Sequence, residues 1–578
     1  MPQADNPHRQ GQITYAVMTR FSRTLIPTLK DAPHDAEAIS HKLLVRAGMV
    51  RQVGAGMWTW MPAGLRVIRK VEAIVREEMD RIGGQEITMP LLQPAEAWEK
   101  TGRYGIDELF KLKDRKGSPM VLAMTHEECV TGHIAGEIRS YRDLPQLLYQ
   151  FQVKERDEAR PRAGVLRTRE FVMKDAYSFD RDIEGLDVSY GLNIEAYDRI
   201  FDRTGLRWYR VEGDVGMMGG LGAHEYMAPC DAGEDEIALA DGYAANIEVA
   251  SAKAQPVDMP PALDAPEEVG TPGKKTVEDV AAAMWVAVGA LIKAVPVVTE
   301  DDEFVLVLVR GDHSVNETKL QNTLGKPYRP AGVEEIGEKL GPAGYIGPVG
   351  AKVRILMDEA IEGGGYVCGA NSEDTHLKGV EPGRDFDFES VDVRTVLAGD
   401  TTESGAVITI EPAIEAANIF KLGTKYSVPL GASFLNEDGV EASVVMGSYG
   451  IGPARIVAAA VEQYADDKGI VWPAAIAPWK VHLVSLAKNG EPEREKADEL
   501  YEQLLDEGIE VLYDDRDGGA GAKFKDAELI GCPVRVAVGR RGLADGVYEV
   551  TLRASGEEQQ VPVEDAALRI AEIARTIT

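Results

Sequence analysis

Residues 154–180, KERDEARPRAGVLRTREFVMKDAYSFD, constrain this chain more than any other stretch. The segment begins with Arg156-Asp-Glu158, passes through a loop rich in Arg, Pro and Gly, and returns through Arg167 to Phe171. Arginine offers a planar, permanently charged fork to a phosphate. A carboxylate can accept from an exocyclic amine, and an aromatic ring can stack on a purine. Taken alone, however, the segment is more typical of an exposed hairpin held by surface ion pairs, which contribute little to stability.

The composition indicates a multidomain globular protein. A chain of 578 residues is too long for one compact core, so three or four domains are expected. Hydrophobic residues at 44% and charged residues at 27% are typical of soluble proteins. A net charge of −32 argues against a protein that coats nucleic acid without specificity, but it does not exclude recognition of one RNA by local basic surfaces.

Three observations bear on the compartment. The cysteines are far apart and form no CxxC pair: Cys129, Cys230, Cys368 and Cys532. This spacing argues against a zinc knuckle or a disulfide framework and favours a reducing cytoplasm. Residues 1–10 are polar and lack a signal-peptide core. Residues 280–298 have the length of a membrane span, but they contain Lys293 and Pro296, so we predict a buried helix followed by a strand and no membrane association.

Two segments before residues 154–180 predict an α/β unit and a polar corner. Apolar residues recur at helical spacing from Leu65 to Met79, glycines stop that helix, and a strand over 86–89 ends at Pro90. Residues 119–134 predict a short strand, the corner Thr-His-Glu-Glu that begins at Thr125, and a helix. Thr125, with a glutamate three residues on, also matches a capping box, which is a purely structural use of these residues.

Glycine-rich turns adjoin two further candidate sites. One turn, GDVGMMGGLG, precedes His224, and a lone histidine is more often structural than catalytic. After a predicted strand over 408–427, a second turn, Gly450-x-Gly452-x-x-Arg455, leads into a helix. Its glycines permit close backbone approach, and a helix N-terminus favours anions, so Arg455 could reach a terminal phosphate. No P-loop sequence is present.

The rest of the chain predicts two additional units. Residues 250–275 are rich in Ala, Pro and Glu, as linkers are. Residues 276–395 then form a separate α/β block, with a helix from Thr276 and a buried strand over 304–309. Residues 476–578 alternate strand and helix in the order βαβαβ, which predicts a mostly parallel sheet.

Together these pieces resemble the three signature motifs of class II aminoacyl-tRNA synthetases, and they occur in the same order. The motifs are the helix and strand that end at Pro90, the segment Arg156-x-Glu158 to Arg-Glu-Phe171, and Gly450-x-Gly-x-x-Arg455. The HIGH and KMSKS signatures of class I are absent. The strings RPRAGVLRTREFVMKDAYSFD, THEE, GGLGAHE, IFKLGTKYS and GSYGIGPAR further resemble bacterial-type prolyl-tRNA synthetases, at intervals over nearly the whole chain.

The resemblance implies an α/β (α+β) multidomain fold. An antiparallel-sheet catalytic core would occupy residues 1–235 and 406–475. Residues 236–405 would form an inserted deacylase-like editing domain with its linkers, and residues 476–578 a βαβαβ anticodon-binding domain. The family also implies a cytoplasmic homodimer that binds proline tRNA, L-proline and ATP. Its reaction is activation of proline to prolyl-adenylate, followed by transfer to the 3′ end of the tRNA.

Site residues follow from the same resemblance. Those implied for ATP are Arg156, Glu158, Arg167, Phe171, Glu415, Thr424, Gly450, Gly452 and Arg455. Those implied for proline are Thr125, Glu127, Arg156 and His224. Arg156, Glu158 and Arg455 would carry the chemistry by positioning the substrates and neutralising phosphate charge. Glu415 would face Mg²⁺, which needs only one or two carboxylates when it bridges phosphates.

The block 276–395 resembles free-standing deacylases of mischarged proline tRNA. A proline pocket cannot strongly reject alanine, because each missing methylene contributes only about 1–3 kcal/mol of discrimination. A second site that hydrolyses alanyl-tRNA is therefore expected. The strings RGDH, GPVG and GAN…H…GRD imply the editing residues Lys293, Gly347, Asp358 and His376. The match around Lys293 is gapped, and His376 could also be structural. Removing 276–395 is expected to abolish this hydrolysis and leave prolylation largely intact.

Two departures and two other interpretations complete the comparison. Glu155 stands where the family usually has an aromatic or apolar residue, and Asn418 stands where many relatives have histidine. A threonyl-type enzyme shares the C-terminal domain but needs a zinc site, of which Cys129 and Cys230 give no convincing sign. A non-catalytic paralogue would be expected to lose the arginines that face phosphate, whereas both are present here.

Overall fold

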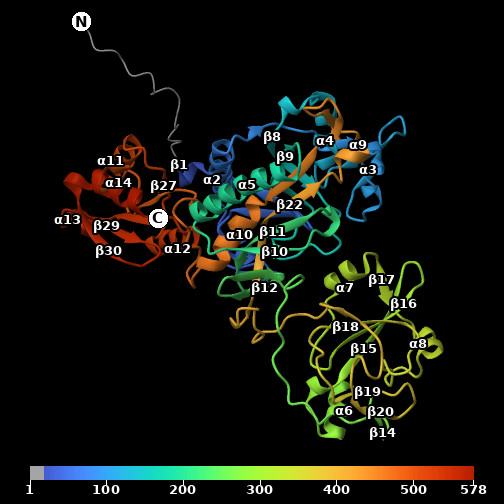
Figure 1. The fold of residues 1–578 in the computed structure, drawn as a ribbon. Coiled ribbons are helices and arrows are strands. Elements are labelled where there is room, and N and C mark those ends of the chain that lie inside the picture. The colour runs from blue at the N-terminus through green and yellow to red at the C-terminus, as the bar shows by residue number, and fades with distance from the viewer. Residues whose placement is uncertain (1–18, 578) are drawn as a thin grey trace.

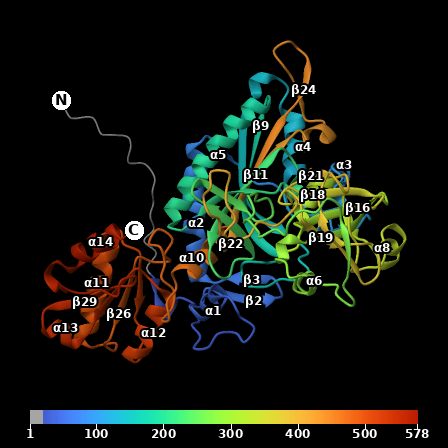
Figure 2. The same ribbon diagram turned by 60° about the horizontal axis from the view of Figure 1, so that its bottom comes forward.

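The computed structural model describes residues 19–577, which form three units (Figure 1, Figure 2). A central α/β unit is built from two stretches of the chain, with a smaller α/β unit inserted between them. A third unit follows at the C-terminus, and it and the inserted unit lie on opposite sides of the central unit in both views. Residues 1–10, which show no signal-peptide core, lie outside the described part. Within residues 19–577 no helix is long and apolar enough to cross a membrane.

A nine-stranded, largely antiparallel sheet forms the middle of the central unit. Its strands are β4 (Gln85–Glu86), β8 (Gln146–Glu155), β9 (Glu170–Asp180), β10 (Tyr209–Gly213), β11 (Gly222–Pro229), β12 (Asp235–Ala240), β13 (Tyr243–Asn246), β22 (Thr409–Gly423) and β25 (Val445–Ile451). Their order is β11-β10-β13-β12-β22-β25-β9-β8-β4, and β11 also pairs with β22. The antiparallel sheet is confirmed, although the predicted strand over 86–89 is only the two-residue β4, and the predicted glycine-rich turn is largely strand β25.

Residues 154–180 form the predicted hairpin. Strands β8 and β9 pair antiparallel, with Glu155 opposite Glu170 and Lys154 opposite Phe171. Side chains alternate between the two faces along each strand. The ammonium of Lys174 accordingly donates to Tyr197 on one face, at 2.7 Å, while the next side chain along β9 points to the other.

Three helices pack against one face of this sheet (Figure 1): α2 (Pro62–Arg81), α5 (Ile183–Thr204) and α10 (Pro453–Tyr464). We call this the helical face and the opposite one the site face. Helix α2 forms because its apolar residues repeat at helical spacing, and Pro62 at its first turn has a backbone already suited to a helix N-terminus. Its predicted end is confirmed at Gly83, which has a φ of 84°.

Short elements cover the site face. They are β5 (Leu92–Pro94), β6 (Lys111–Lys113), β7 (Pro119–Leu122), α3 (Glu96–Lys100), α4 (Glu127–Glu137) and α9 (Ser427–Leu430). The strand, corner and helix predicted around Thr125 are confirmed, but the capping box is not formed. Helix α4 has His126 as its N-cap without a side-chain cap, and the Thr125 hydroxyl donates instead to Glu127.

The inserted unit has a five-stranded and a three-stranded sheet. Its strands are β14 (Glu267–Gly270), β15 (Ile292–Thr299), β16 (Phe304–Arg310), β17 (Tyr328–Pro330), β18 (Arg354–Asp358), β19 (Tyr366–Gly369), β20 (Thr375–Val380) and β21 (Glu389–Val391). Its helices include α6 (Val277–Met284), α7 (Glu317–Leu324) and α8 (Val333–Lys339). The helix and strand predicted within 280–298 are therefore confirmed as parts of α6 and β15. Because β12 and β13 belong to the central sheet, the central unit continues to Asn246, beyond the predicted boundary at residue 235.

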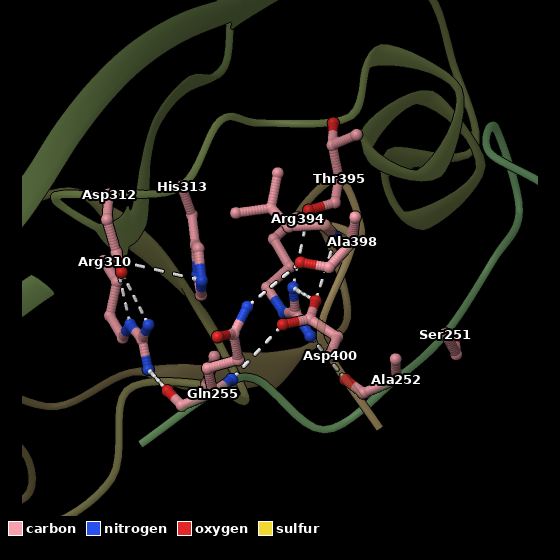
Figure 3. Close-up of polar contacts among 12 residues, drawn as sticks. Ser251, Ala252, Gln255, Arg310, Asp312, His313, Arg394, Thr395, Ala398 and Asp400 are labelled. Atoms are coloured by element: carbon pink, nitrogen blue, oxygen red, sulfur yellow. Dashed lines mark hydrogen bonds and ion pairs between the residues drawn. The ribbon is translucent and has the colours of Figure 1, made fainter. Parts of the chain in front are cut away.

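The two chain segments that enter and leave the inserted unit are joined by buried polar contacts (Figure 3). Arg394 forms an ion pair with Asp400 at 2.6 Å and donates to the carbonyl of Ala252, also at 2.6 Å. Asp400 accepts from the backbone N–H of Gln255, and Arg310 donates to the Gln255 carbonyl at 2.7 Å. Both crossings are thus held to each other at the root of the inserted unit.

The C-terminal unit contains the predicted βαβαβ order: β26 (Val481–Ser485), α11 (Pro492–Asp506), β27 (Val511–Asp514), α12 (Ala520–Ile530) and β28 (Val534–Val538). It continues through α13 (Arg540–Ala544), β29 (Val547–Leu552), β30 (Glu558–Pro562) and α14 (Ala566–Thr576). Strands β26, β27 and β28 are parallel, as predicted. The sheet also gains β1 (Thr19–Arg20), which pairs with the edge strand β27. Two residues carry no sequence pattern, so this strand was not predicted.

Candidate active site

A cavity of about 290 Å³ opens on the site face between the β8–β9 loop, β22 and the start of α10. The residues predicted to bind ATP that line it are Arg156, Glu158, Arg167, Phe171, Glu415, Gly450, Gly452 and Arg455. Thr424 does not line it, because it lies exposed beyond the end of β22. The fold therefore brings together side chains from three distant motifs.

Arg156 is the central cation of this cavity. Its guanidinium carbon lies 5.1 Å from the centre of the Phe171 ring, and its buried Nε has no hydrogen-bond partner. Within residues 19–577, no carboxylate lies within ion-pair distance of Arg156. Burial, and after it the nearby Arg455, lower its pKa, but an arginine remains charged at any physiological pH. A half-buried cation without a carboxylate partner is a strong candidate to bind an anionic ligand.

An ion pair joins the two sides of the hairpin loop. Arg167 lies 2.9 Å from Glu158, and this hydrogen bond lowers the pKa of the Glu158 carboxyl. Glu158 therefore stays ionised and can accept hydrogen bonds from a ligand amine.

Arg455 enters the cavity from the first turn of α10. Its guanidinium lies 2.9 Å from the Glu415 carboxylate and donates to the Glu415 carbonyl at 2.7 Å. The Asn418 amide donates to the other carboxylate oxygen at 2.7 Å. Asn418, one of the two departures from the family pattern, therefore orients Glu415 by hydrogen bonding.

Two further carboxylates were missed by the sequence prediction. Glu225 lies opposite Asn418 on the neighbouring strand β11, and Asp235 lines the cavity. Burial, followed by repulsion from Glu415, raises the pKa of Glu225 to about 8 and that of Asp235 to about 6. A cation would relieve this crowding, so the residues around Glu415 fit Mg²⁺. No group of three potential ligands forms a metal cage in the described chain, and a phosphate-bridging Mg²⁺ does not require one.

A buried acidic corner lies further along the site face. Thr125 donates to one oxygen of Glu127 at 2.5 Å, and Ser448 of β25 donates to the other at 2.9 Å. Arg103 lies 3.5 Å from Glu127 and 3.1 Å from Glu128. One guanidinium thus faces two carboxylates, and a corner with excess negative charge is suited to an ammonium group. Sequence reasoning missed both residues: Arg103 belongs to no motif, and nothing in the string GSYGIGPAR shows that the Ser448 hydroxyl reaches Glu127.

Similar proteins decide the family. A proline–tRNA ligase from Thermodesulfovibrio yellowstonii is 48% identical over 565 residues, which cover 95% of this chain and 98% of that protein. A proline–tRNA ligase from Geobacter sp. is 47% identical over 572 residues, with the same coverage. The chain belongs to the proline–tRNA ligase family.

Two domain models and a solved structure agree with this membership. An aminoacyl-tRNA editing domain matches residues 271–386, and an anticodon binding domain matches residues 480–573. The fold is shared with a prolyl-tRNA synthetase from Cryptosporidium parvum complexed with halofuginone and AMPPNP. That match has a TM-score of 0.57 at 14% identity and covers 93% of this chain and 77% of the other. The inserted unit is therefore the editing domain of this proline–tRNA ligase family member, and the C-terminal unit is its anticodon-binding domain.

His224 does not lie at the acidic corner, so its predicted place in the proline pocket was wrong. It is opposite Ile419, a residue of the core on the helical face, and its Nδ1 lies 2.7 Å from the Tyr190 hydroxyl of α5. Its neighbours Ala223 and Glu225 point to the site face instead. Because side chains alternate along a strand, a shift of one residue is enough to move a group to the wrong face.

In the editing domain, His376 lines a cavity of about 380 Å³. Its Nδ1 lies 2.6 Å from the Thr271 hydroxyl, and burial lowers the pKa of its ring. Gly347 follows the lining residue Ile346, and a Cβ at this glycine would lie only 2.0 Å from the Gly369 carbonyl oxygen. Glycine is therefore required at position 347 for a steric reason. Lys293 also borders this cavity, although its ammonium donates to the carbonyl of His313 at 2.7 Å.

Asp358 is not among the residues that line this cavity, and its editing role stays a prediction. Its carboxylate accepts from the backbone N–H groups of Val393 and Arg394, both at 2.9 Å, and of Ala360 at 3.0 Å. The side chain is 1% exposed. These bonds tie β18 to the chain segment that leaves the domain.

Proposed function

We propose that this chain activates L-proline with ATP and transfers the prolyl group to the 3′ end of proline tRNA. The observation that carries the proposal is the pairing of two sites on one face of the sheet. Arg156, a half-buried cation without a carboxylate partner, lies in one site, and the acidic corner at Glu127 lies in the other. An amino acid needs both charges, one for its carboxylate and one for its ammonium.

The proposed reaction is a displacement between positioned substrates. Proline binds with its ammonium at Thr125 and Glu127 and its carboxylate at Arg156, and the purine of ATP stacks on Phe171. A carboxylate oxygen of proline attacks the α-phosphorus in line, a new oxygen–phosphorus bond forms, and the bond to pyrophosphate breaks. Arg156 and Arg455 stabilise the charge that develops on the phosphate oxygens. When bound beside Glu415, Mg²⁺ supplies further neutralisation of phosphate charge.

The remaining domains are assigned parts of the same cycle. The C-terminal domain binds the anticodon end of the tRNA, and the cavity at His376 hydrolyses alanyl-tRNA. The homodimer and the cytoplasmic location implied by the family stay predictions.

The direct test is ATP–pyrophosphate exchange with each of the twenty amino acids. Proline is expected to support exchange, and the smaller alanine should do so more weakly, because a missing methylene contributes about 1–3 kcal/mol. Exchange with threonine but not proline would indicate a threonyl-type enzyme. No exchange with any amino acid would indicate a non-catalytic paralogue.

A further inference from the structure

Four buried polar side chains lie directly beneath the acidic corner, and we call them the buried network: His126, Lys154, Asp175 and Tyr177. The Lys154 ammonium lies 2.7 Å from the His126 Nδ1 and 2.6 Å from an Asp175 carboxylate oxygen. The other Asp175 oxygen accepts from the Tyr177 hydroxyl at 2.7 Å and from the Gln150 amide at 3.0 Å. The Tyr177 oxygen in turn accepts the backbone N–H of His126 at 3.2 Å.

The protonation of the buried network follows from its surroundings. Burial, and after it Lys154, lower the pKa of His126 to about 4, so its ring is neutral at physiological pH. Its Nδ1 therefore accepts from the Lys154 ammonium, and Asp175 balances that ammonium's charge. Lys154 and His126 are each 0% exposed and Asp175 is 3% exposed.

A buried ion pair of this kind is weak evidence for stability, because removing two charges from water costs nearly as much as their attraction returns. Its position supplies a more specific use. His126 stands between Thr125 and Glu127, so both its backbone N–H and its ring fix the corner from below. Lys154 lies on β8 two residues before Arg156, which directly follows the strand and still pairs with the Arg169 carbonyl, so both side chains point to the site face. The buried network therefore connects the group proposed for the proline ammonium with the group proposed for its carboxylate.

We propose that Lys154, Asp175, Tyr177 and His126 are positioning residues, which set the Thr125–Glu127 corner relative to Arg156 and so determine the affinity for the amino acid. This inference rests on the proposed function. None of the four touches proline or ATP. Their effect reaches the substrate through the backbone of the corner, which carries Thr125 and Glu127.

The test variant is Tyr177→Phe, which removes one hydroxyl and leaves the ring in place. Without its bonds to Asp175 and to the His126 N–H, the corner is held less firmly. The KM for proline in ATP–pyrophosphate exchange should therefore rise about 10-fold, because small displacements of substrate-positioning groups have effects on this scale. The KM for ATP should change less than about twofold, because the β8–β9 loop is not altered. If the four residues only stabilised the fold, the KM for proline and the KM for ATP would change to the same extent.

Tyr449→Phe is the matched control. Tyr449 is also fully buried, on the adjacent strand β25, but its hydroxyl bonds to Ser178 on the helical face at 2.9 Å. This variant should leave both KM values within about twofold of wild type. Asp175→Asn, which keeps an oxygen acceptor for Tyr177 but removes the charge beside Lys154, is the second test variant and should show the same selective rise for proline.

The possible outcomes separate this inference from the proposed function. If the wild type shows no proline-dependent exchange, the proposed function fails. If the wild type is active and both Tyr177→Phe and Asp175→Asn keep a wild-type KM for proline, only the positioning role is overturned. An equal rise in both KM values, or the same effect in Tyr449→Phe, overturns it as well. Should one test variant fail to fold by circular dichroism, the other decides.

Discussion

The two cavities of this molecule differ in how well their residues were predicted. In the central unit, all but one of the predicted ATP residues line a single cavity. In the editing domain, His376 and Lys293 border the cavity. Asp358 does not line it, and its carboxylate accepts hydrogen bonds from three backbone N–H groups. The two regions differ in whether the predicted charged groups already have hydrogen-bond partners within the protein. Arg156 has no partner for its Nε and is available to a ligand, whereas the carboxylate of Asp358 is already engaged.

The largest effect is expected from Arg156→Ala. Removing the partnerless cation should lower proline-dependent ATP–pyrophosphate exchange at least ~100-fold, the usual scale for losing one charge-stabilising donor. Arg156→Lys is the matched variant: it keeps a charge without the planar fork, so its activity should lie between wild type and alanine. A wild-type rate in Arg156→Ala would contradict the assignment of this cavity.

Asp358→Asn should act on stability and not on the cavity. The amide can replace only part of the carboxylate's bonding, so the editing domain should lose roughly 1–2 kcal/mol in free energy of unfolding. Thermal unfolding followed by circular dichroism measures this loss. Asp301→Asn is the control, because its side chain is exposed and pairs with Lys326, and surface pairs contribute at most about 1 kcal/mol. If Asp358→Asn is as stable as the control but loses alanyl-tRNA hydrolysis, the original catalytic prediction is right.

His224→Ala tests the corrected face of β11. Because His224 packs on Tyr190 on the helical face, its removal should change the KM for proline less than about twofold. Glu127→Gln, on the site face, should raise the same KM at least ~10-fold, because a buried charge-assisted bond to the ammonium is lost. Equal effects of the two substitutions would show that His224 reaches the substrate after all.

The smallest effect concerns Glu155, the second departure from the family pattern. Burial and repulsion from Glu170, which is opposite it across the hairpin, raise the pKa of Glu155 to about 7. A folded-state pKa above the unfolded value stabilises the protein below about pH 4.5, and this contribution is lost as pH rises through about 7. Glu170→Gln removes the repulsion, so the variant should lose less stability over this pH range than the wild type does. The difference should be less than about 1 kcal/mol, since solvent screens the pair. Denaturant unfolding at pH 5 and pH 8 measures the free energy of unfolding of both proteins. If Glu170→Gln loses as much stability between these pH values as the wild type does, this account of Glu155 is contradicted.

Sequence alone predicted the architecture well, because helices, strands and motifs are local patterns. Helix α2, the βαβαβ order and the hairpin at 154–180 all follow from spacing and turn residues. Contacts between distant segments could not be predicted. Arg103 and Ser448 reach Glu127 from other elements, and β1 is too short to show a pattern. The face of His224 required strand register, which no periodicity in a glycine-rich segment fixes.

The central claim is that synthesis and hydrolysis occur at separate sites, one at Arg156 and the other at His376. Measuring proline exchange and alanyl-tRNA hydrolysis in both Arg156→Ala and His376→Ala tests it most directly. Arg156→Ala should lose exchange at least ~100-fold and keep hydrolysis, whereas His376→Ala should lose hydrolysis at least ~10-fold and keep exchange. If either substitution abolished both activities in a folded protein, the separation of the two sites would be contradicted.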